Sequence, residues 1–290
     1  MGLEGSELKS NPNPFENPSD GLLVARLPDD CNATHNLVLN KYPVISRHSI
    51  LSTIGFKRQT DFLESQDLEV TYSCLQAWGA ESTEASPSQL FAFFNSGKHS
   101  GASQPHRHLQ LLPVEDMMDP QSPRTEWQLL IDLMREPLPP DSSLLSSLSL
   151  PFCHYAMRIP ANPGTGVLHQ IYHRLYDNAS KSVQSWNEGC PLEHRAVDNN
   201  SGEAPISYNL AMTTHTMAIC PRRKESATLP TTSGVGSAAV NGTILGGTLM
   251  VKEMSEWEAF RQNHVVIDDV LAEIGIPYLS NPGDALSTRT

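Results

Sequence analysis

A loop rich in glycine and serine joins two short apolar segments, and it constrains the fold more than any other feature of this chain. The stretches 90–95 and 106–113 are apolar runs bounded by turn residues, which is typical of buried strands. Between them lies Asn95-Ser-Gly-Lys-His-Ser-Gly-Ala-Ser-Gln104. Glycine allows close backbone approach and serine adds hydroxyl donors. The sequence therefore predicts two strands whose connecting loop can surround a phosphate-sized anion.

The second predicted strand carries the triplet His106, His108 and Gln110. Side chains alternate between the faces of a strand, so these three project from one face. A neutral imidazole held through one nitrogen can attack phosphorus with the other. The alternatives are a strand pair without chemistry and one arm of a zinc site, with His48 or His99 as a third ligand. The adjoining loop and Gln110 favour chemistry on a nucleotide phosphate.

The run from Phe91 to Pro113 resembles the active-site region of the diadenosine tetraphosphate phosphorylases, also called ATP adenylyltransferases. This family lies in the wider histidine-triad and galactose-1-phosphate uridylyltransferase superfamily. Other stretches similar to the family occur in the same order on both sides. They are Asn13-Pro-Phe15, Leu22-Leu-Val24, His35 to Val44, Arg47 to Thr53, Ser207 to Thr213, Cys220 to Lys224 and Val240 to Lys252. The resemblance spans about residues 13 to 278, with a poorly matched middle.

The resemblance implies a nucleotidyltransferase that splits diadenosine tetraphosphate into ATP and ADP by double displacement, and the reverse. His108 would attack an α-phosphorus to form a nucleotidyl-histidine, which inorganic phosphate would then attack. Gln110 would hold phosphoryl oxygens, and His106 would orient the strand or loop. The implied substrate contacts are Asn95, Gly97, Ser100, Gly101, Ser103, Gln104, Asn40, Lys41, Asn209, Thr213 and Lys252. Donors aimed at a transferring phosphoryl group usually contribute most to catalysis. No cofactor or metal-ligand set is required, although a divalent cation such as Mg²⁺ on the nucleotide is compatible.

Strands and helices occur without a regular β-α-β rhythm, which predicts an α+β fold rather than a doubly wound parallel sheet. The resemblance narrows this to a histidine-triad-like antiparallel sheet with flanking helices, in which two half-domains of one chain form a pseudo-dimer. We expect a flexible segment at 1–20, a catalytic region at 21–180, a loop at 181–205 and a carboxy-terminal region at 206–290.

Local patterns predict the individual elements. Strands are expected at 22–26, 37–40, 49–53, 90–95, 106–113, 208–213, 216–220 and 248–251. Helices are expected at 66–79, 125–134, 166–178, 255–260 and 266–274, and linkers at 137–149, 181–205 and 230–239. The helix at 66–79 has Ser65 and Asp67 at its cap, and the helix at 255–260 has Ser255 with Glu258. His169 and His173 share a helix face, and a core or surface pair is favoured over a zinc site.

Composition limits the classes of function. The formal net charge of −12 argues against a nucleic-acid coat, which needs a broad basic surface. A phosphate pocket needs only local positive charge, for which the candidates are Lys41, Arg47, Lys98, Arg107, Arg222, Arg223, Lys224 and Lys252. Arg107 is the weakest of them because strand alternation points it away from His108. An odd set of 5 cysteines without a C-x-x-C pair argues against a disulfide framework. Without an amino-terminal apolar run or a long apolar window, we expect a cytoplasmic protein without membrane or nucleic-acid partners.

One departure from the family lies at the amino terminus. Members usually carry several dozen residues before the Asn-Pro-Phe motif, including a basic residue for polyphosphate, whereas Met1 to Pro12 precede it here. Loss of that contact predicts weaker phosphorolysis or a changed substrate. Two other hypotheses therefore stay open. One is a repurposed enzyme that uses His108 or His106 as general acid or base on a non-nucleotide substrate, and the other is a nucleotide sensor without turnover.

Overall fold

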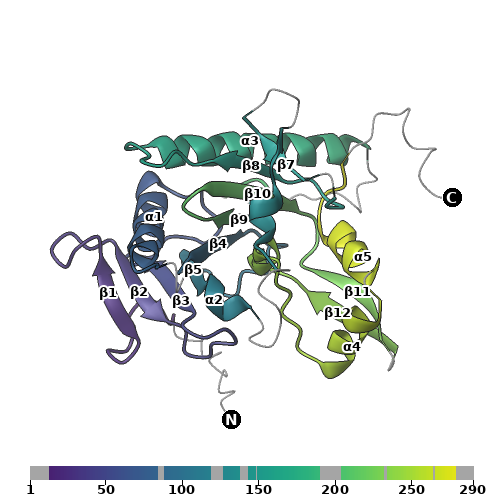
Figure 1. Cartoon of the computed structure of the whole chain (residues 1–290), viewed down its shortest axis with the longest axis horizontal. Helices are drawn as coiled ribbons and strands as arrows, with labels where there is room; N and C mark the ends of the chain where they lie inside the picture. The colour runs from purple at the N-terminus through teal and green to yellow at the C-terminus, as the bar shows by residue number, and fades with distance from the viewer. Residues whose placement is uncertain are drawn as a thin grey trace, which may run out of the picture.

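The computed structural model describes residues 13–83, 88–118, 127–137, 143–147, 149–189, 204–231, 234–263 and 265–278. Within these ranges the main element is a 10-stranded antiparallel sheet in the order β1-β2-β3-β5-β4-β9-β10-β8-β7-β6. Its strands are β1 Leu23–Leu27, β2 His35–Leu39, β3 Ser49–Thr53, β4 Leu90–Ser96, β5 His108–Pro113, β6 Glu136–Pro137, β7 Leu145–Ser146, β8 Tyr155–Arg158, β9 Ser207–Met212 and β10 Thr216–Arg222. This arrangement (Figure 1) confirms the α+β fold with a large antiparallel sheet.

The sheet consists of two halves with the same topology. In the first half the chain runs β1, β2, β3, helix α1 (Ser65–Ala80), β4 and β5. In the second half it runs β6, β7, β8, helix α3 (Val167–Gly189), β9 and β10. The strand order of each half mirrors the other, and the central strands β4 and β9 join them. This duplication is the pseudo-dimer expected from the family; along the chain, the first half ends with β5 and the second begins with β6.

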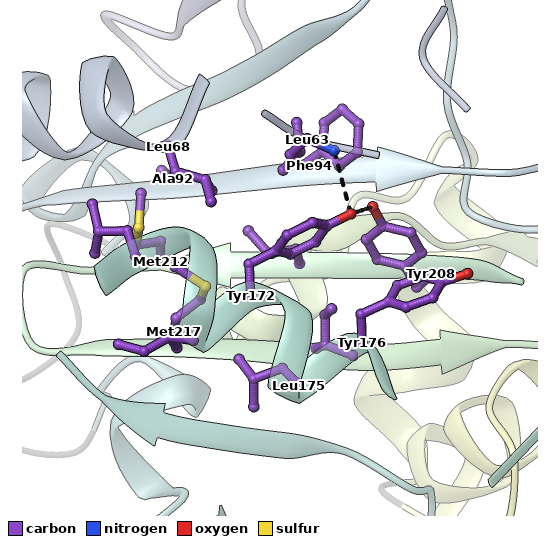
Figure 2. Packing of buried hydrophobic residues seen from close by; sticks show 14 of the residues in the cluster. Leu63, Leu68, Ala92, Phe94, Tyr172, Leu175, Tyr176, Tyr208, Met212 and Met217 are labelled. Atoms are coloured by element: carbon purple, nitrogen blue, oxygen red, sulfur yellow. Dashed lines mark hydrogen bonds between the residues drawn. The ribbon is translucent and has the colours of Figure 1, made fainter. Parts of the chain in front are cut away.

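The helices α1 and α3 cover one face of the sheet, where the larger apolar core lies. Tyr172 of α3 reaches the sheet and shares a hydrogen bond of 2.7 Å with the hydroxyl of Tyr208 on β9. Its oxygen also accepts from the backbone N–H of Leu63 at 3.3 Å, as Figure 2 shows. These bonds satisfy polar groups that burial would otherwise leave without partners.

The opposite face of the central strands is covered by the carboxy-terminal elements. A second apolar core joins this face to strands β11 and β12, helices α4 and α5, and two short 3-10 helices. These elements are β11 Ser226–Thr231, β12 Gly234–Ala239, α4 Met254–Gln262, α5 Val265–Ile274, η1 Leu130–Leu133 and η3 Gly242–Gly246; the four-residue helix α2 Val114–Met117 follows β5. In the described ranges, no helix combines the length and the apolar character needed to cross a membrane.

The structure corrects several expected elements. In the part of 125–134 that is described, η1 replaces the predicted helix, because the buried residues Leu129, Ile131 and Met134 do not follow helical spacing. The predicted strand at 248–251 is irregular backbone. The segment 230–239, expected to be a linker, lies almost wholly within the β11–β12 hairpin. The linker at 137–149 contains β7, and β8 had no predicted counterpart.

Helix ends were also displaced from their predicted positions. Helix α3 continues to Gly189, so the first part of the predicted loop at 181–205 is helical. Glu64 and Asp67 form the capping box of α1, and Asp67 Oδ2 accepts from the Glu64 N–H at 2.7 Å. Helix α4 has an equivalent box from Glu253 and Glu256 instead of Ser255 and Glu258. Carboxylates can cap helices as hydroxyls do, and their charge also favours a helix N-terminus.

Candidate active site

The glycine-serine loop turns sharply between β4 and β5. Gly97 and Gly101 have φ angles of 87° and 77°, a region that favours glycine. A Cβ atom on Gly101 would lie 2.9 Å from the Cβ of Asn241, so the segment before η3 packs directly on the loop. The buried Ser100 hydroxyl donates to the Gly97 carbonyl at 2.7 Å. The loop is therefore held in one shape by its own turn and by Asn241.

His108 stands at the start of β5 with one nitrogen committed. Its Nδ1 lies 2.8 Å from the carbonyl oxygen of His106, which can only accept, so Nδ1 carries the hydrogen. In a neutral ring, Nε2 then holds the lone pair. Burial lowers the pKa of His108 to about 4, which keeps the ring neutral at ordinary pH. Gln59 fixes the backbone on which the ring is mounted, because its Oε1 accepts from the His108 N–H at 2.7 Å.

His106 uses both of its ring nitrogens in structural contacts. Asn13 Oδ1 accepts from the Phe15 N–H at 3.1 Å, so its Nδ2 donates to His106 Nδ1 at 2.9 Å. Thr53 donates its hydroxyl hydrogen to the Gly55 carbonyl at 2.8 Å, and its oxygen accepts from His106 Nε2 at 3.0 Å. The lone pair and the N–H of His106 are both occupied. The geometry thus separates the roles of the two histidines, leaving His108 as the ring with a free lone pair.

A third imidazole, His48, lies beside the triplet. Asn40 Oδ1 accepts from the Tyr42 N–H at 3.1 Å, so its Nδ2 faces His48 Nδ1 at 3.0 Å and donates to it. His48 Nε2 must then carry a hydrogen, and it is buried with no hydrogen-bond partner among the described residues. Burial lowers the pKa of His48, and the Gln110 side chain adjoins the ring. His48 therefore presents an unused N–H donor next to Gln110.

Asn95 and Asn209 lie opposite each other at the seam between β4 and β9. Asn209 Nδ2 donates to Asn95 Oδ1 and to the Ser100 carbonyl, both at 2.8 Å. Asn95 Oδ1 also accepts from the Gly242 N–H at 2.9 Å. The two asparagines tie the loop, both halves of the sheet and the start of η3 together.

The buried Arg222 continues this network on β10. Its Nη1 donates to Asn209 Oδ1, and its Nη2 donates to the backbone carbonyls of Lys224 at 2.9 Å and Val240 at 3.0 Å. Desolvation by burial lowers the pKa of Arg222 to about 10. In the described part of the chain this guanidinium has no carboxylate in an ion pair. It therefore contributes positive potential behind the loop.

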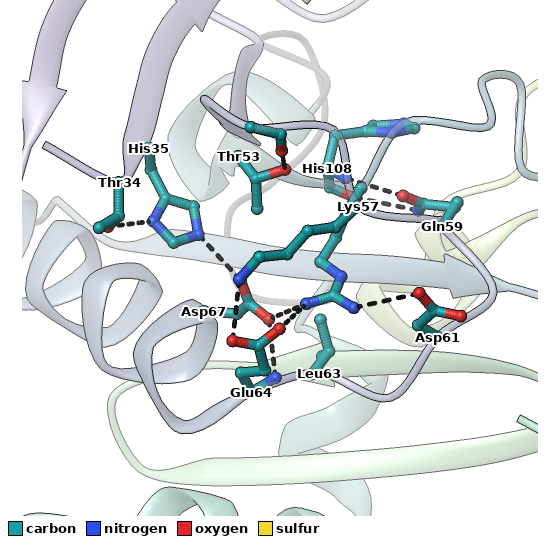
Figure 3. A network of polar contacts seen from close by, with 12 residues as sticks. Thr34, His35, Thr53, Lys57, Gln59, Asp61, Leu63, Glu64, Asp67 and His108 are labelled. Atoms are coloured by element: carbon teal, nitrogen blue, oxygen red, sulfur yellow. Dashed lines mark hydrogen bonds and ion pairs between the residues drawn. The ribbon is translucent and has the colours of Figure 1, made fainter. Parts of the chain in front are cut away.

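Arg107 points away from His108, as predicted. Its Nη1 binds Asp67 Oδ2 at 2.9 Å and Glu64 Oε1 at 3.0 Å under helix α1. Figure 3 shows this network, in which His35 approaches Asp67 from the other side at 3.0 Å. Burial alone would raise the pKa of Asp67, but the His35 bond and the Arg107 charge together lower it. Arg107 fixes the back of the strand and has no part in the site.

The remaining predicted contacts are less closely joined to His108. Ser103 is exposed and Gln104 half-buried on the loop, and Lys41 is exposed beside the Tyr42 ring. Lys252 lies in an exposed turn before α4. Thr213 lies just after β9, four residues along the chain from Asn209, and its hydroxyl accepts from the N–H groups of His215 and Thr216.

Several residues of the site have a role that the sequence did not predict. Gln59 lies outside every stretch that resembles the family. Arg222 and Asn241 lie within such stretches, and Arg222 was a candidate for positive charge, but the sequence did not predict that they hold the loop, because those contacts arise across the fold. The sequence suggested a role for His48 only as a metal ligand. Its hydrogen bond to Asn40, which fixes the tautomer of the ring, could not be predicted from the sequence. Among the described residues, no three His, Cys, Asp or Glu side chains form a group that could hold a metal ion.

Two family models match this chain in succession. The Ap4A phosphorylase N-terminal domain matches residues 4–128, and the ATP adenylyltransferase C-terminal domain matches residues 148–277. The chain belongs to the Ap4A phosphorylase family. Within this family, the first model contains the H-x-H-x-Q strand and the second contains Asn209 and Arg222. The first model contains β1 to β5, the second contains β8 to β10, and β6 and β7 lie between them.

Relatives of this Ap4A phosphorylase family member occur in Saccharomyces cerevisiae. Diadenosine 5',5'''-P1,P4-tetraphosphate phosphorylase 2 is 27% identical over 274 residues, which cover 91% of this chain and 76% of the relative. Protein APA1 is 28% identical over 253 residues, covering 86% of this chain and 71% of the relative. The crystal structure of yeast Ap4A phosphorylase Apa2 has a TM-score of 0.71 and 25% identity, covering 91% of this chain and 81% of that chain. Its complex with AMP has a TM-score of 0.69.

Proposed function

We propose that this chain is an Ap4A phosphorylase that transfers an adenylyl group through His108. The observation that carries the proposal is the 2.8 Å contact between His108 Nδ1 and the His106 carbonyl. This contact leaves the lone pair on Nε2, which points away from the strand beside the glycine-serine loop between β4 and β5. The relatives named as Ap4A phosphorylases support the substrate.

In the first step, His108 Nε2 attacks an α-phosphorus of Ap4A. A P–N bond forms, the bond from that phosphorus to the bridging oxygen breaks, and ATP leaves. The ring becomes an imidazolium-like adduct, whose positive charge the His106 carbonyl stabilises through Nδ1–H. In the second step, an oxygen of inorganic phosphate attacks the same phosphorus, the P–N bond breaks and ADP leaves. His108 returns to its neutral form.

The hydrogen-bond donors around His108 would bind different parts of the negatively charged polyphosphate. Gln110 and the Nε2–H of His48 would bind non-bridging oxygens of the transferred phosphoryl group, where negative charge develops. Asn95, Ser100 and Gly101 would shape the polyphosphate site, with Arg222 adding positive potential from behind. Ser103, Gln104, Asn40, Lys41, Asn209 and Lys252 remain proposed substrate contacts or their supports.

The experiment that tests this proposal is intact-protein mass spectrometry after mixing the protein with Ap4A in the absence of phosphate. The wild type is expected to gain one adenylyl unit and to lose it when phosphate is added. His108→Ala should gain none, whereas His173→Ala, a half-buried histidine on α3, should behave as the wild type. Binding of nucleotide without an adduct or turnover in the wild type would instead support a sensor, and neither binding nor turnover would support a repurposed enzyme.

A further inference from the structure

The strand that carries His108 has an equivalent in the second half of the sheet. His108 is the first residue of β5 and pairs with Ser52 of β3. Thr216 is the first residue of β10 and pairs with Arg158 of β8. Because β5 and β10 occupy the same place in the two half-sheets, Thr216 stands where the first half has His108.

Thr216 and His108 also face the same side of the sheet. Ala218 and Leu112 both lie in the second apolar core, and each is an even number of residues from the start of its strand. The hairpin before Thr216 is closed by residues 213–215, whereas 97–107 join β4 to β5. The second half therefore has an equivalent hairpin with a shorter loop, and Thr216 occupies the position that His108 has in the first half.

An open pocket of about 750 Å³ lies at this second hairpin. Thr214 and His215 line it from the hairpin, and Arg158 lines it from β8. Gln89 and Val114, which flank β4 and β5, form its other side. The pocket thus lies at the end of β5 opposite His108, about 17 Å away along the strand at 3.3 Å per residue. A volume of this size suits a nucleotide-sized molecule, since small-molecule sites span roughly 300–1,000 Å³.

Among the described residues, the basic side chains that border the pocket are Arg135, Arg158 and His215. Asp132 also lines the pocket; burial raises the pKa of its carboxyl group, and the charges of Arg135 and Arg158 act in the opposite direction. In the described ranges, Arg135 and Arg158 form no ion pair. Arg158 Nη1 donates to Thr216 Oγ1 at 3.2 Å, and Arg135 Nε donates to the backbone carbonyl of Asp132. Each arginine uses one donor in these bonds, so its fork retains donors for a ligand.

The second carboxylate of the pocket, Glu115, has hydrogen-bond partners in other elements. Glu115 Oε1 accepts from Arg47 Nη2 at 3.2 Å and from Trp78 Nε1 at 3.3 Å. Arg47 also binds Asp116 at 2.7 Å, so the described lining has no formal excess of either charge, and what it offers a ligand is two arginine side chains beside one carboxylate. Arginine forks match the geometry of phosphate oxygens, and a carboxylate such as Asp132 can accept from ligand hydroxyls.

We propose that this pocket is a second, non-catalytic binding site for a phosphate-bearing small molecule of nucleotide size. Arg135 and Arg158 bind the phosphate, and Asp132 accepts hydrogen bonds from hydroxyl groups of the ligand. The site binds without transferring a group, because Thr216 replaces the histidine. It does not depend on the chemistry proposed for His108.

The first test is protection of arginines from phenylglyoxal, read by peptide mass spectrometry. AMP is expected to slow modification of Arg135 and Arg158 at least threefold, and adenosine is expected to leave it unchanged. Arg174 and Arg261 are exposed elsewhere on the surface and serve as internal controls. Orthophosphate is tested alone. Protection by orthophosphate as strong as that by AMP would identify free phosphate as the ligand, and protection by AMP only would identify a nucleotide. Equal modification of Arg135 and Arg158 with and without AMP and orthophosphate would overturn the proposal.

Equilibrium dialysis with labelled AMP provides the second test. The wild type is expected to bind one more molecule per chain than the double variant Arg135→Gln, Arg158→Gln. The matched variant Arg174→Gln, Arg261→Gln should retain the wild-type number. This difference between variants persists even if AMP does not bind near His108, so failure of the proposed function and failure of this site are distinguishable. Equal binding by the wild type and the pocket variant would contradict a second site.

Discussion

His48 Nδ1 accepts a hydrogen bond from Asn40 Nδ2 at 3.0 Å, and this bond determines which nitrogen of the ring carries the hydrogen. The Nε2–H that results is buried without a partner in the described residues. A buried donor without a partner is costly unless a ligand uses it. We therefore expect His48→Ala to lower kcat/KM for Ap4A about 100-fold, the usual effect of removing a donor to a phosphoryl or oxyanion group. Steady-state kinetics would measure it.

A loss within twofold would contradict this role for His48. Asn40→Ala provides a second measurement, because it frees the ring to change tautomer or rotate while leaving the imidazole in place. We expect a smaller loss than for His48→Ala.

Stability should depend on pH through two buried histidines. Burial lowers the pKa of His108 and of His154 to about 4, against 6.5 for an exposed ring. Between those values the unfolded chain binds more protons than the folded one. The stabilisation is complete above pH 6.5 and is lost as the pH falls toward 4. Each histidine accounts for up to about 3 kcal/mol of unfolding free energy over this range.

Urea denaturation at pH 7, 5.5 and 4.5 measures this dependence. His154→Gln is a suitable comparison, because glutamine can still accept a bond in place of His154 Nε2, which accepts from the Ser147 N–H at 2.8 Å. We expect the variant to lose less stability between pH 7 and 4.5 than the wild type. Identical pH dependence in both proteins would show that His154 does not contribute.

Gly101→Ala should disturb the loop. The residue has a φ of 77°, and the added Cβ would lie 2.9 Å from the Cβ of Asn241. We expect a loss of about 1–3 kcal/mol in unfolding free energy and weaker nucleotide binding. Gly79→Ala on α1 is the matched control, because a Cβ there meets nothing within 4 Å. It should stabilise the helix by about 0.5–1 kcal/mol. Similar effects from both substitutions would refute the steric argument.

Arg222→Met should be strongly destabilising. It would leave Asn209 Oδ1 and the backbone carbonyls of Lys224 and Val240 without their donor. Losing several buried partners is expected to cost about 3–5 kcal/mol. Thermal and urea unfolding would measure the loss, with the exposed Arg174→Met as control. A loss below 1 kcal/mol would show that the network does not hold the loop.

Arg222→Lys adds a readout specific to the site. Lysine keeps the charge but cannot contact Asn209 and the carbonyls with a planar fork. If the variant folds, we expect it to raise KM for Ap4A.

Much of the fold could be predicted from local pattern. The strand at 49–53 and most of β4, β5, β9 and β10 appear where alternation and apolar runs place them. Helix α3 extends beyond its prediction because Ala179 and Val183 continue its buried face through a polar stretch. Strands β11 and β12 were missed because their Gly, Ser and Thr residues are typical of loops, and only packing against α4 and α5 makes them strands.

The part of the site that is contiguous in sequence could be predicted, and the part that depends on long-range contacts could not. The triplet and its loop are contiguous in sequence, so alternation alone placed His108 and Arg107 on opposite faces. The bonds that distinguish His108 from His106 come from Asn13 and Thr53, which are distant in sequence. The Arg222–Asn209–Asn95 network also crosses the seam between the half-sheets. Such contacts depend on tertiary structure and produce no regular pattern in the sequence, so they could not be predicted from it.

The seam between β4 and β9 has a consequence for assembly. Asn95 comes from one half of the chain and Asn209 from the other, and each orients the same loop. Neither half alone could present the loop in its active shape. Enzymatic activity would therefore appear only after both halves have folded and docked, so that turnover during refolding reports completion of the whole sheet rather than of its first half.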